Sequence, residues 1–123
     1  MKRVLIIDDA STIRLYKRCI LEKHGYLVEE AVNGMEGLEK ALESHFDLYI
    51  VDINMPKLDG YGFLQRIRAE DIDQPPAMMV STESAAQDKE IAYQSGANLY
   101  LVKPAKPAEL LTFVRLLMGD HHS

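Results

Sequence analysis

Residues 4–9 read Val-Leu-Ile-Ile-Asp-Asp, an apolar run that stops at two consecutive aspartates. Two later segments repeat this order, because residues 48–51 are followed by Asp52 and residues 99–102 by Lys103. Continuous short apolar runs are typical of strands that are buried on both faces of a parallel sheet. The carboxyl ends of such strands meet at one edge of the sheet, where ligands bind. We therefore expect three acids and a lysine in one pocket, a set that favours a bound cation.

Strand-like and helix-like segments alternate five times along the chain, which predicts an α/β fold with a parallel sheet covered by helices on both faces. The expected strands are residues 4–7, 26–32, 48–51, 77–80 and 99–102. The second of these is interrupted by Glu29 and Glu30, so we expect it at an edge of the sheet. The expected helices are residues 11–24, 33–45, 60–69, 84–96 and a last one that begins near 107.

Residues suited to capping mark most of these helix ends. The expected N-caps are Ser11, Asn33 and Ser84, and the last two are followed three residues later by Glu36 and Gln87, as in a capping box. Gly25 and Gly96 are expected to end the first and fourth helices, and Pro107 suits the first turn of the last helix. The helix at 60–69 has the weakest capping signal.

The composition is that of an ordinary globular domain, with 123 residues, 47% hydrophobic and 27% charged. We expect one domain over residues 1–123, with a core at about 3–118 and a C-terminal tail at 119–123. The apolar runs are too short for a membrane span or a signal peptide, so we expect a cytoplasmic protein without membrane insertion. A net charge of -5 argues against direct nucleic-acid binding by this domain.

Cysteine and histidine give no signal of metal or redox chemistry. Cys19 is the single cysteine, which excludes an internal disulfide, and we expect it to be buried on the first helix. The histidines, to which we assign no chemistry, are His24, His45, His121 and His122.

Four segments follow the expected strand ends in order: Asp8-Asp9, then residues 52–56 (Asp-Ile-Asn-Met-Pro), then residues 80–82 (Val-Ser-Thr), then Lys103-Pro104. Together they resemble the receiver domain of two-component response regulators, and segments 9–14 and 59–62 also resemble that family. The resemblance covers residues 4 to about 118. It implies a flavodoxin-like doubly wound sheet with strand order 2-1-3-4-5.

The resemblance also implies a metal site and a phosphorylation site. Asp52 matches the phosphoacceptor, and Asp8 and Asp9 match the acidic pair that holds Mg²⁺. The main-chain carbonyl of Asn54 matches the group that completes the metal site. A carboxylate is a competent nucleophile toward phosphorus once the charge on the phosphoryl oxygens is neutralised. Without metal, we expect the clustered carboxylates to raise one another's pKa values.

The switch residues are likewise implied by the resemblance. Ser81 matches the switch hydroxyl, Lys103 the phosphate-contacting lysine and Tyr100 the aromatic switch residue. The implied phosphodonor is a sensor histidine kinase or a phosphotransfer protein. Phosphorylation would change a surface that binds an unidentified downstream protein, and the domain would then dephosphorylate itself. Such a module catalyses its own phosphoryl transfer without being a conventional enzyme.

Some positions depart from the usual family pattern. Thr82 stands where the family more often has alanine or glycine, so we expect its bulk to narrow access to the phosphoryl group and to tune hydrolysis. Ala105 stands where a larger apolar residue is frequent. Asn54 and Glu83 resemble the pair found in single-domain chemotaxis regulators, and we expect that pair to tune hydrolysis. The Lys103-Pro104 bond is a candidate cis peptide.

Other interpretations of these residues remain open at this level. Taken singly, Asp8 or Asp9 is suited to helix capping, Asp52 to a turn and Tyr100 to core packing. An unphosphorylated scaffold of the same fold is one alternative function. A Mg²⁺-dependent phosphatase of the haloacid dehalogenase type is another, although such enzymes place the nucleophile after the first strand. The chain is either a stand-alone regulator or one domain of a longer protein, and Met1, three residues before the first strand, favours a natural start.

Overall fold

The computed structural model describes residues 1–119, in which five strands alternate with five helices. The elements are β1 (Arg3–Ile7), α1 (Ser11–Lys23), β2 (Leu27–Ala31), α2 (Gly34–Glu43), β3 (Leu48–Asp52), α3 (Gly60–Arg68), β4 (Ala77–Ser81), α4 (Ala86–Ser95), β5 (Leu99–Val102) and α5 (Pro107–Met118). Residues 120–123 of the expected C-terminal tail, which include His121 and His122, lie outside the described part of the chain.

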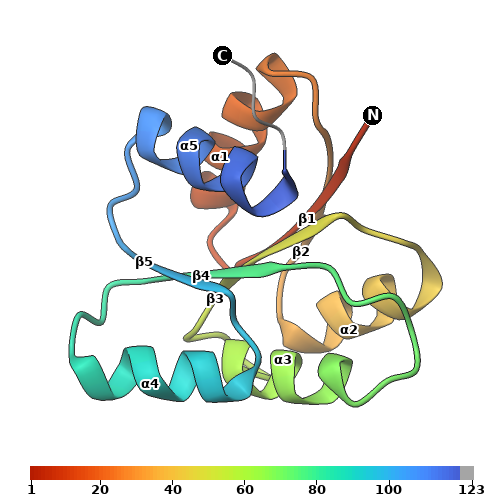
Figure 1. Cartoon of the computed structure of the whole chain (residues 1–123), viewed down its shortest axis with the longest axis vertical. Helices are drawn as coiled ribbons and strands as arrows, with labels where there is room; N and C mark the ends of the chain where they lie inside the picture. Colours follow the sequence, from red (N-terminus) through yellow and green to blue (C-terminus); the bar gives the residue numbers. More distant parts are fainter. Residues whose placement is uncertain (120–123) are drawn as a thin grey trace.

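The strands form one parallel sheet in the order β2-β1-β3-β4-β5. The predicted α/β class, the strand order and the edge position of β2 are therefore confirmed. Figure 1 shows α1 and α5 on one face of the sheet and α2, α3 and α4 on the other. The strand order reverses between β1 and β3, and the carboxyl ends of these two strands carry the aspartates. The fold thus places the acids at the position where doubly wound sheets bind ligands.

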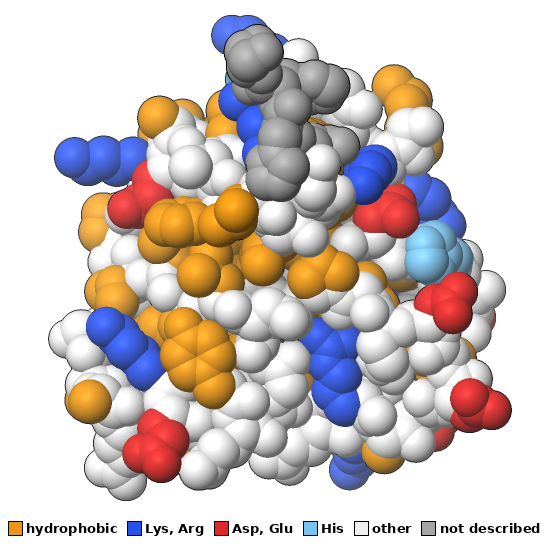
Figure 2. All heavy atoms as spheres, viewed as in Figure 1, with side chains coloured by type: hydrophobic (Ala, Val, Ile, Leu, Met, Phe, Trp, Pro, Cys, Tyr) orange, Lys and Arg blue, Asp and Glu red, His pale blue; other side chains and the backbone are white. Residues whose placement is uncertain are grey.

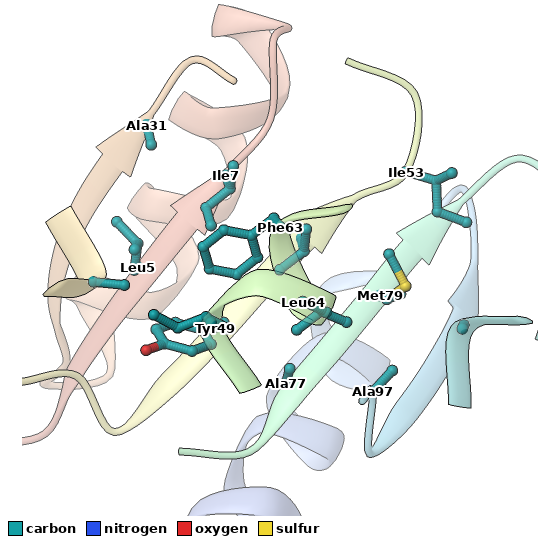
Figure 3. Packing of buried hydrophobic residues seen from close by; sticks show 14 of the residues in the cluster. Leu5, Ile7, Ala31, Tyr49, Ile53, Phe63, Leu64, Ala77, Met79 and Ala97 are labelled. Carbon is teal, nitrogen blue, oxygen red and sulfur yellow. The ribbon is translucent and has the colours of Figure 1, made fainter. Parts of the chain in front are cut away.

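The core has two parts because successive residues of a strand point to opposite faces. Leu5 and Ile7 of β1 belong to the cluster under α2, α3 and α4, whereas Val4 and Ile6 belong to the cluster under α1 and α5. Figure 3 shows the first cluster, in which Tyr49, Phe63 and Leu64 lie between the sheet and α3. The rings of Tyr49 and Phe63 meet edge to face with centroids 5.3 Å apart. Burial on both faces explains why the central strands have continuous apolar sequences.

Two of the predicted N-caps are wrong. Ala10 caps α1 in place of Ser11, and Ala85 caps α4 in place of Ser84, in neither case with a side-chain hydrogen bond. Asn33 caps α2 as predicted, since its side chain accepts a hydrogen bond from the Glu36 amide. The helix expected to be poorly capped has a full cap, because Asp59 accepts a hydrogen bond from the Gly62 amide.

Two helix ends follow the sequence pattern, whereas one residue of α1 does not. Gly96 ends α4 in a left-handed conformation as expected, and Pro107 begins α5. Cys19 is exposed on α1, so its predicted burial is wrong; it lies on the opposite side of the helix from the buried Lys17 and Leu21. Within residues 1–119 no helix combines the length and hydrophobicity needed to cross a membrane.

The two ends of the described chain lie close together. The Lys2 ammonium donates a hydrogen bond of 2.6 Å to the carbonyl of Met118, the last residue of α5. This contact ties the segment before β1 to the end of the last helix, at the amino-terminal edge of β1.

Candidate functional site

Three carboxylates meet at the carboxyl end of the sheet. Asp8 and Asp9 follow β1 directly, and Asp52 is the last residue of β3. One carboxylate oxygen from each lies within 4.8 Å of the others. Asp8 is fully buried and Asp52 is 7% exposed, whereas Asp9 is exposed. The structure therefore brings together the three acids that the sequence singled out, two of them out of water.

Asp8 supplies an oxygen without a hydrogen bond. Its Oδ1 accepts a hydrogen bond of 2.9 Å from the Ala10 amide, so this carboxylate also orders the turn into α1. Its Oδ2 is buried and has no hydrogen-bond donor among residues 1–119. A buried carboxylate oxygen without a donor is costly, and the ammonium groups of Lys17 and Lys103, at 3.9 and 3.7 Å, are too far away to donate a hydrogen bond to it. The oxygen donors of Asp8, Asp9 and Asp52 therefore fit Mg²⁺, which prefers carboxylate ligands.

The electrostatics of Asp52 reflect the same crowding. Burial raises the pKa of the Asp52 carboxyl, the nearby charge of Asp8 raises it further, and the hydrogen bond from Lys103 opposes both. The expectation that clustered carboxylates raise the pKa thus holds for Asp52, with burial as the larger cause. A positive ion placed here would favour the ionised form.

Lys103 reaches the acids from the end of β5. Its Nζ lies 3.1 Å from Oδ1 of Asp52 and 3.7 Å from Oδ2 of Asp8. The backbone fixes this position, because the Lys103 amide donates a hydrogen bond of 2.7 Å to the Ser81 carbonyl. The Lys103-Pro104 peptide bond is cis, as the sequence indicated. The lysine expected in the pocket is therefore present there.

Ser81 is the last residue of β4, the strand between β3 and β5. It is buried, and its Oγ accepts a hydrogen bond of 3.1 Å from the Glu83 amide. Thr82 and Glu83 follow in an exposed loop. The Ser81 hydroxyl is therefore buried at the start of this loop, while Thr82 and Glu83, two of the three residues expected to tune hydrolysis, are exposed on it.

Tyr100 lies in β5 with its ring buried in the cluster under α4. Its hydroxyl donates a hydrogen bond of 2.7 Å to the Glu83 carbonyl. Burial raises the pKa of this hydroxyl, so it remains a donor. Tyr100 therefore ties β5 to the loop that follows Ser81, and core packing and loop contact are combined in one side chain.

The loop between β3 and α3 holds Asn54, which is exposed. The Gly60 amide donates to the Ile53 carbonyl at 2.8 Å, closing this loop behind Asp52. A Cβ at Gly60 would lie 2.3 Å from the Asp52 carbonyl oxygen, which leaves room for glycine alone. The Gly34 amide donates to the Leu58 carbonyl at 3.0 Å, so the same loop is also fixed to α2.

Lys17 also lies at this site, although it is not among the site residues predicted from the sequence. It lies on α1 with its side chain 3% exposed, and its Nζ is 3.9 Å from Oδ2 of Asp8. Burial lowers the pKa of Lys17 to about 8, while the charge of Asp8 opposes the shift. The sequence does contain a signal of its burial. Lys17 has the helical spacing of Ile13 and Leu21, and the other residues on that face of the helix are apolar or aromatic.

Comparison with known proteins identifies the family. Residues 4–115 match the family model described as the response regulator receiver domain. The chain is 38% identical over 119 residues to the DNA-binding dual master transcriptional regulator RpaA of Synechocystis, a match that covers 96% of this chain and 49% of RpaA. This chain spans about half the length of the curated relatives it matches.

Solved structures agree with that match. The chemotaxis protein CheY4 of Vibrio cholerae is 36% identical, with a TM-score of 0.90 and coverage of 95% of this chain and 98% of CheY4. The receiver domain of the sensor histidine kinase PA1611 of Pseudomonas aeruginosa is 28% identical, with a TM-score of 0.89 and coverage of 96% and 98%. That structure has a magnesium ion coordinated in its active site cleft. The sheet order, the family match and these structural neighbours agree, and the chain belongs to the receiver domain family of two-component response regulators.

Proposed function

We propose that the chain is a phosphoacceptor module in which Asp52 receives a phosphoryl group from a sensor histidine kinase or a phosphotransfer protein. The observation that carries this proposal is the meeting of Asp52 with Asp8, Asp9 and Lys103 at one end of the sheet. A carboxylate nucleophile, a cation site and a fixed ammonium are the parts that phosphoryl transfer needs.

The proposed transfer uses one oxygen of Asp52 as nucleophile. This oxygen attacks the phosphorus of a phosphohistidine, the new P–O bond forms, and the P–N bond breaks as the donor imidazole leaves. In this proposal Lys103, whose Nζ lies 3.1 Å from Asp52, neutralises charge on the phosphoryl oxygens, and the Ser81 hydroxyl donates a hydrogen bond to them. In the proposed dephosphorylation, water attacks phosphorus and loses a proton to solvent, the P–O bond to Asp52 breaks, and inorganic phosphate leaves.

The proposed metal is Mg²⁺, held by Asp8, Asp9, Asp52 and the main-chain carbonyl of Asn54. When bound, the ion would neutralise the charge that builds up on the phosphoryl oxygens. Two observations support it: the unsatisfied Oδ2 of Asp8, and the magnesium in the cleft of the PA1611 receiver domain.

The proposed output is a change at the surface formed by α4, β5 and α5, which would bind a downstream protein. Figure 2 shows hydrophobic side chains gathered on the face of the molecule that includes these elements. Tyr93 on α4 is 48% exposed, and Leu116 on α5 is 55% exposed. The Tyr100 hydroxyl links this region to the loop after Ser81. A cytoplasmic location is part of this proposal.

Intact-mass measurement after incubation with acetyl phosphate tests the proposal. The native chain should gain one phosphoryl group in the presence of Mg²⁺, and neither Asp52→Asn nor chelated native protein should gain it. Asp71→Asn is the matched control, because Asp71 is exposed and lies outside the cluster. If the native chain gains no phosphoryl group from acetyl phosphate or from a panel of histidine kinases, and does not bind beryllofluoride, the scaffold function is favoured instead.

A further inference from the structure

Lys17 lies beside the acidic cluster and has no part in the proposed transfer. Its side chain is 3% exposed, so the ammonium is almost entirely out of water. It forms an ion pair with Oδ2 of Asp8 at 3.9 Å, a distance too long for a hydrogen bond. That Asp8 oxygen is the one that has no hydrogen-bond donor. Lys17 therefore faces the atom that a metal would need.

Apart from the carboxylates of the cluster, the described groups around Lys17 are largely apolar. Ile13, Val80 and Ala105 line, with Lys17, an apolar cavity of about 370 Å³ next to the site. Lys103 is a second positive charge in the same place, with its Nζ 3.7 Å from the same Asp8 oxygen. A buried ammonium among apolar groups is held chiefly by the carboxylate that it faces.

Charge balance indicates what this arrangement does. Three carboxylates and two ammonium groups leave the cluster with one net negative charge, and without Lys17 it would have two. A divalent cation that binds Asp8 must share its carboxylate with both lysines. Repulsion between like charges at this range is strong because burial lowers the local dielectric.

We propose that Lys17 is a built-in counter-cation for Asp8, which weakens Mg²⁺ binding and keeps the acidic cluster balanced when no metal is bound. This inference rests on the magnesium site of the proposed function. It makes Lys17 a positioning residue that sets the metal concentration at which the site fills.

The test is Mg²⁺ titration of the unphosphorylated full chain by isothermal calorimetry, with native protein, Lys17→Met and Lys23→Met. Methionine keeps the length and apolar stem of lysine without its charge, and the neighbouring cavity gives it room. Lys23 is an exposed lysine on the same helix, so its variant removes the same charge away from the cluster. Lys17→Arg restores the charge, and Lys17→Gln replaces Lys17→Met if the latter does not fold.

Lys17→Met should bind Mg²⁺ about tenfold more tightly than the native chain, as expected for removing a unit charge close to a ligand oxygen. Lys23→Met should stay within about twofold of native, because exposed charges at a distance are screened. Lys17→Arg should bind as weakly as the native chain. The gain in melting temperature on adding Mg²⁺ should also be larger for Lys17→Met than for native protein.

Equal Mg²⁺ affinity for Lys17→Met and Lys23→Met would overturn the counter-cation role and leave the proposed function intact. Weaker binding by Lys17→Met would also overturn it, since the lysine would then support the metal site. If neither the native chain nor Lys17→Met bound Mg²⁺, both this inference and the magnesium part of the proposed function would fail.

Discussion

The Lys103 ammonium donates a hydrogen bond of 3.1 Å to Oδ1 of Asp52, which joins the ends of β5 and β3 across the end of β4. This contact offsets part of the cost of burying Asp52 beside Asp8, yet the pKa of Asp52 stays raised, with burial as the main cause. The site is therefore electrostatically strained in the absence of metal, and stability is the first quantity in which this strain should appear.

Asp52→Asn should raise the free energy of unfolding of the metal-free protein by about 1 kcal/mol at neutral pH. Because the folded state holds the Asp52 proton more tightly than the unfolded state, ionised Asp52 destabilises the fold above its folded pKa. This penalty should fade as the pH falls through that raised value toward the ordinary aspartate range. Urea unfolding of both chains across that range measures the difference. A variant less stable than native at neutral pH would contradict the argument.

Millimolar Mg²⁺ should raise the melting temperature of the native chain, because a ligand that binds the folded state alone stabilises it. Asp8→Asn should lose most of this gain, since it removes the charge of the buried carboxylate that faces the proposed metal. Asp73→Asn, an exposed change outside the cluster, is the control and should keep the gain. A native melting temperature that does not respond to Mg²⁺ would count against the metal site.

Ser81→Ala should still be phosphorylated on Asp52 but should lose the response to phosphorylation. The Ser81 hydroxyl accepts a hydrogen bond from the Glu83 amide, and the Glu83 carbonyl accepts one from the Tyr100 hydroxyl. The loop after Ser81 therefore connects the site to β5. Amide NMR shifts at Tyr100 and along α4, measured with and without beryllofluoride, report the response. If the Ser81→Ala variant showed shift changes as large as those of the native chain, Ser81 would not be part of the switch.

Asn54→Ala and Glu83→Ala should each lengthen the lifetime of the phosphorylated state several-fold, the scale expected for groups that position water. Both residues are exposed, and each follows a strand end by two residues, Asn54 after Asp52 and Glu83 after Ser81. Loss of label from phosphorylated protein in the presence of Mg²⁺ gives the rate. A lifetime equal to that of the native chain in both Asn54→Ala and Glu83→Ala would show that these residues have no role in hydrolysis.

Thr82→Ala should shorten or preserve the lifetime of the phosphorylated state, because it removes bulk next to Ser81.

Gly60→Ala should cost about 1–3 kcal/mol of stability, as overpacking does, and should also impair the site. The added Cβ would meet the Asp52 carbonyl at 2.3 Å and the Met79 side chain at 2.6 Å. Gly25→Ala is the comparison. Gly25 has a φ of +90°, and an added Cβ there would contact nothing within 4 Å, so the only cost is backbone strain of about 1 kcal/mol. Both variants should be less stable, but Gly60→Ala alone should lose the Mg²⁺-induced gain in melting temperature.

The sheet and the acidic cluster could be predicted from the sequence because they depend on local signals. Continuous apolar runs identify strands that are buried on both faces, and the position of Asp8, Asp52 and Lys103 after those runs fixes their place at the carboxyl edge. The Asn33 cap was predictable for the same reason, since the Asn33 side chain and the Glu36 amide that it binds lie within one turn.

The errors concern features that depend on backbone angles or on packing. Ser11 and Ser84 have suitable side chains, but the extended conformation that a cap requires falls one residue earlier for Ser11 and one later for Ser84. Cys19 and Lys17 lie two residues apart on α1, and the cysteine, which was expected to be buried, is exposed, whereas the lysine is buried. Residue type alone predicts the opposite, because the rotation of α1 against the sheet is set by contacts distant in sequence.

The hydrogen bond between Lys2 and Met118 makes the described chain nearly a closed loop. A short linker could therefore join its two ends, and new termini could be opened in the turn near Asp71 and Asp73, which are exposed. Such a circular permutant would keep every strand pairing and would leave the aspartate edge intact. A reporter domain inserted at the joined ends would lie at the edge of the sheet opposite to the aspartates and would therefore not block access to them.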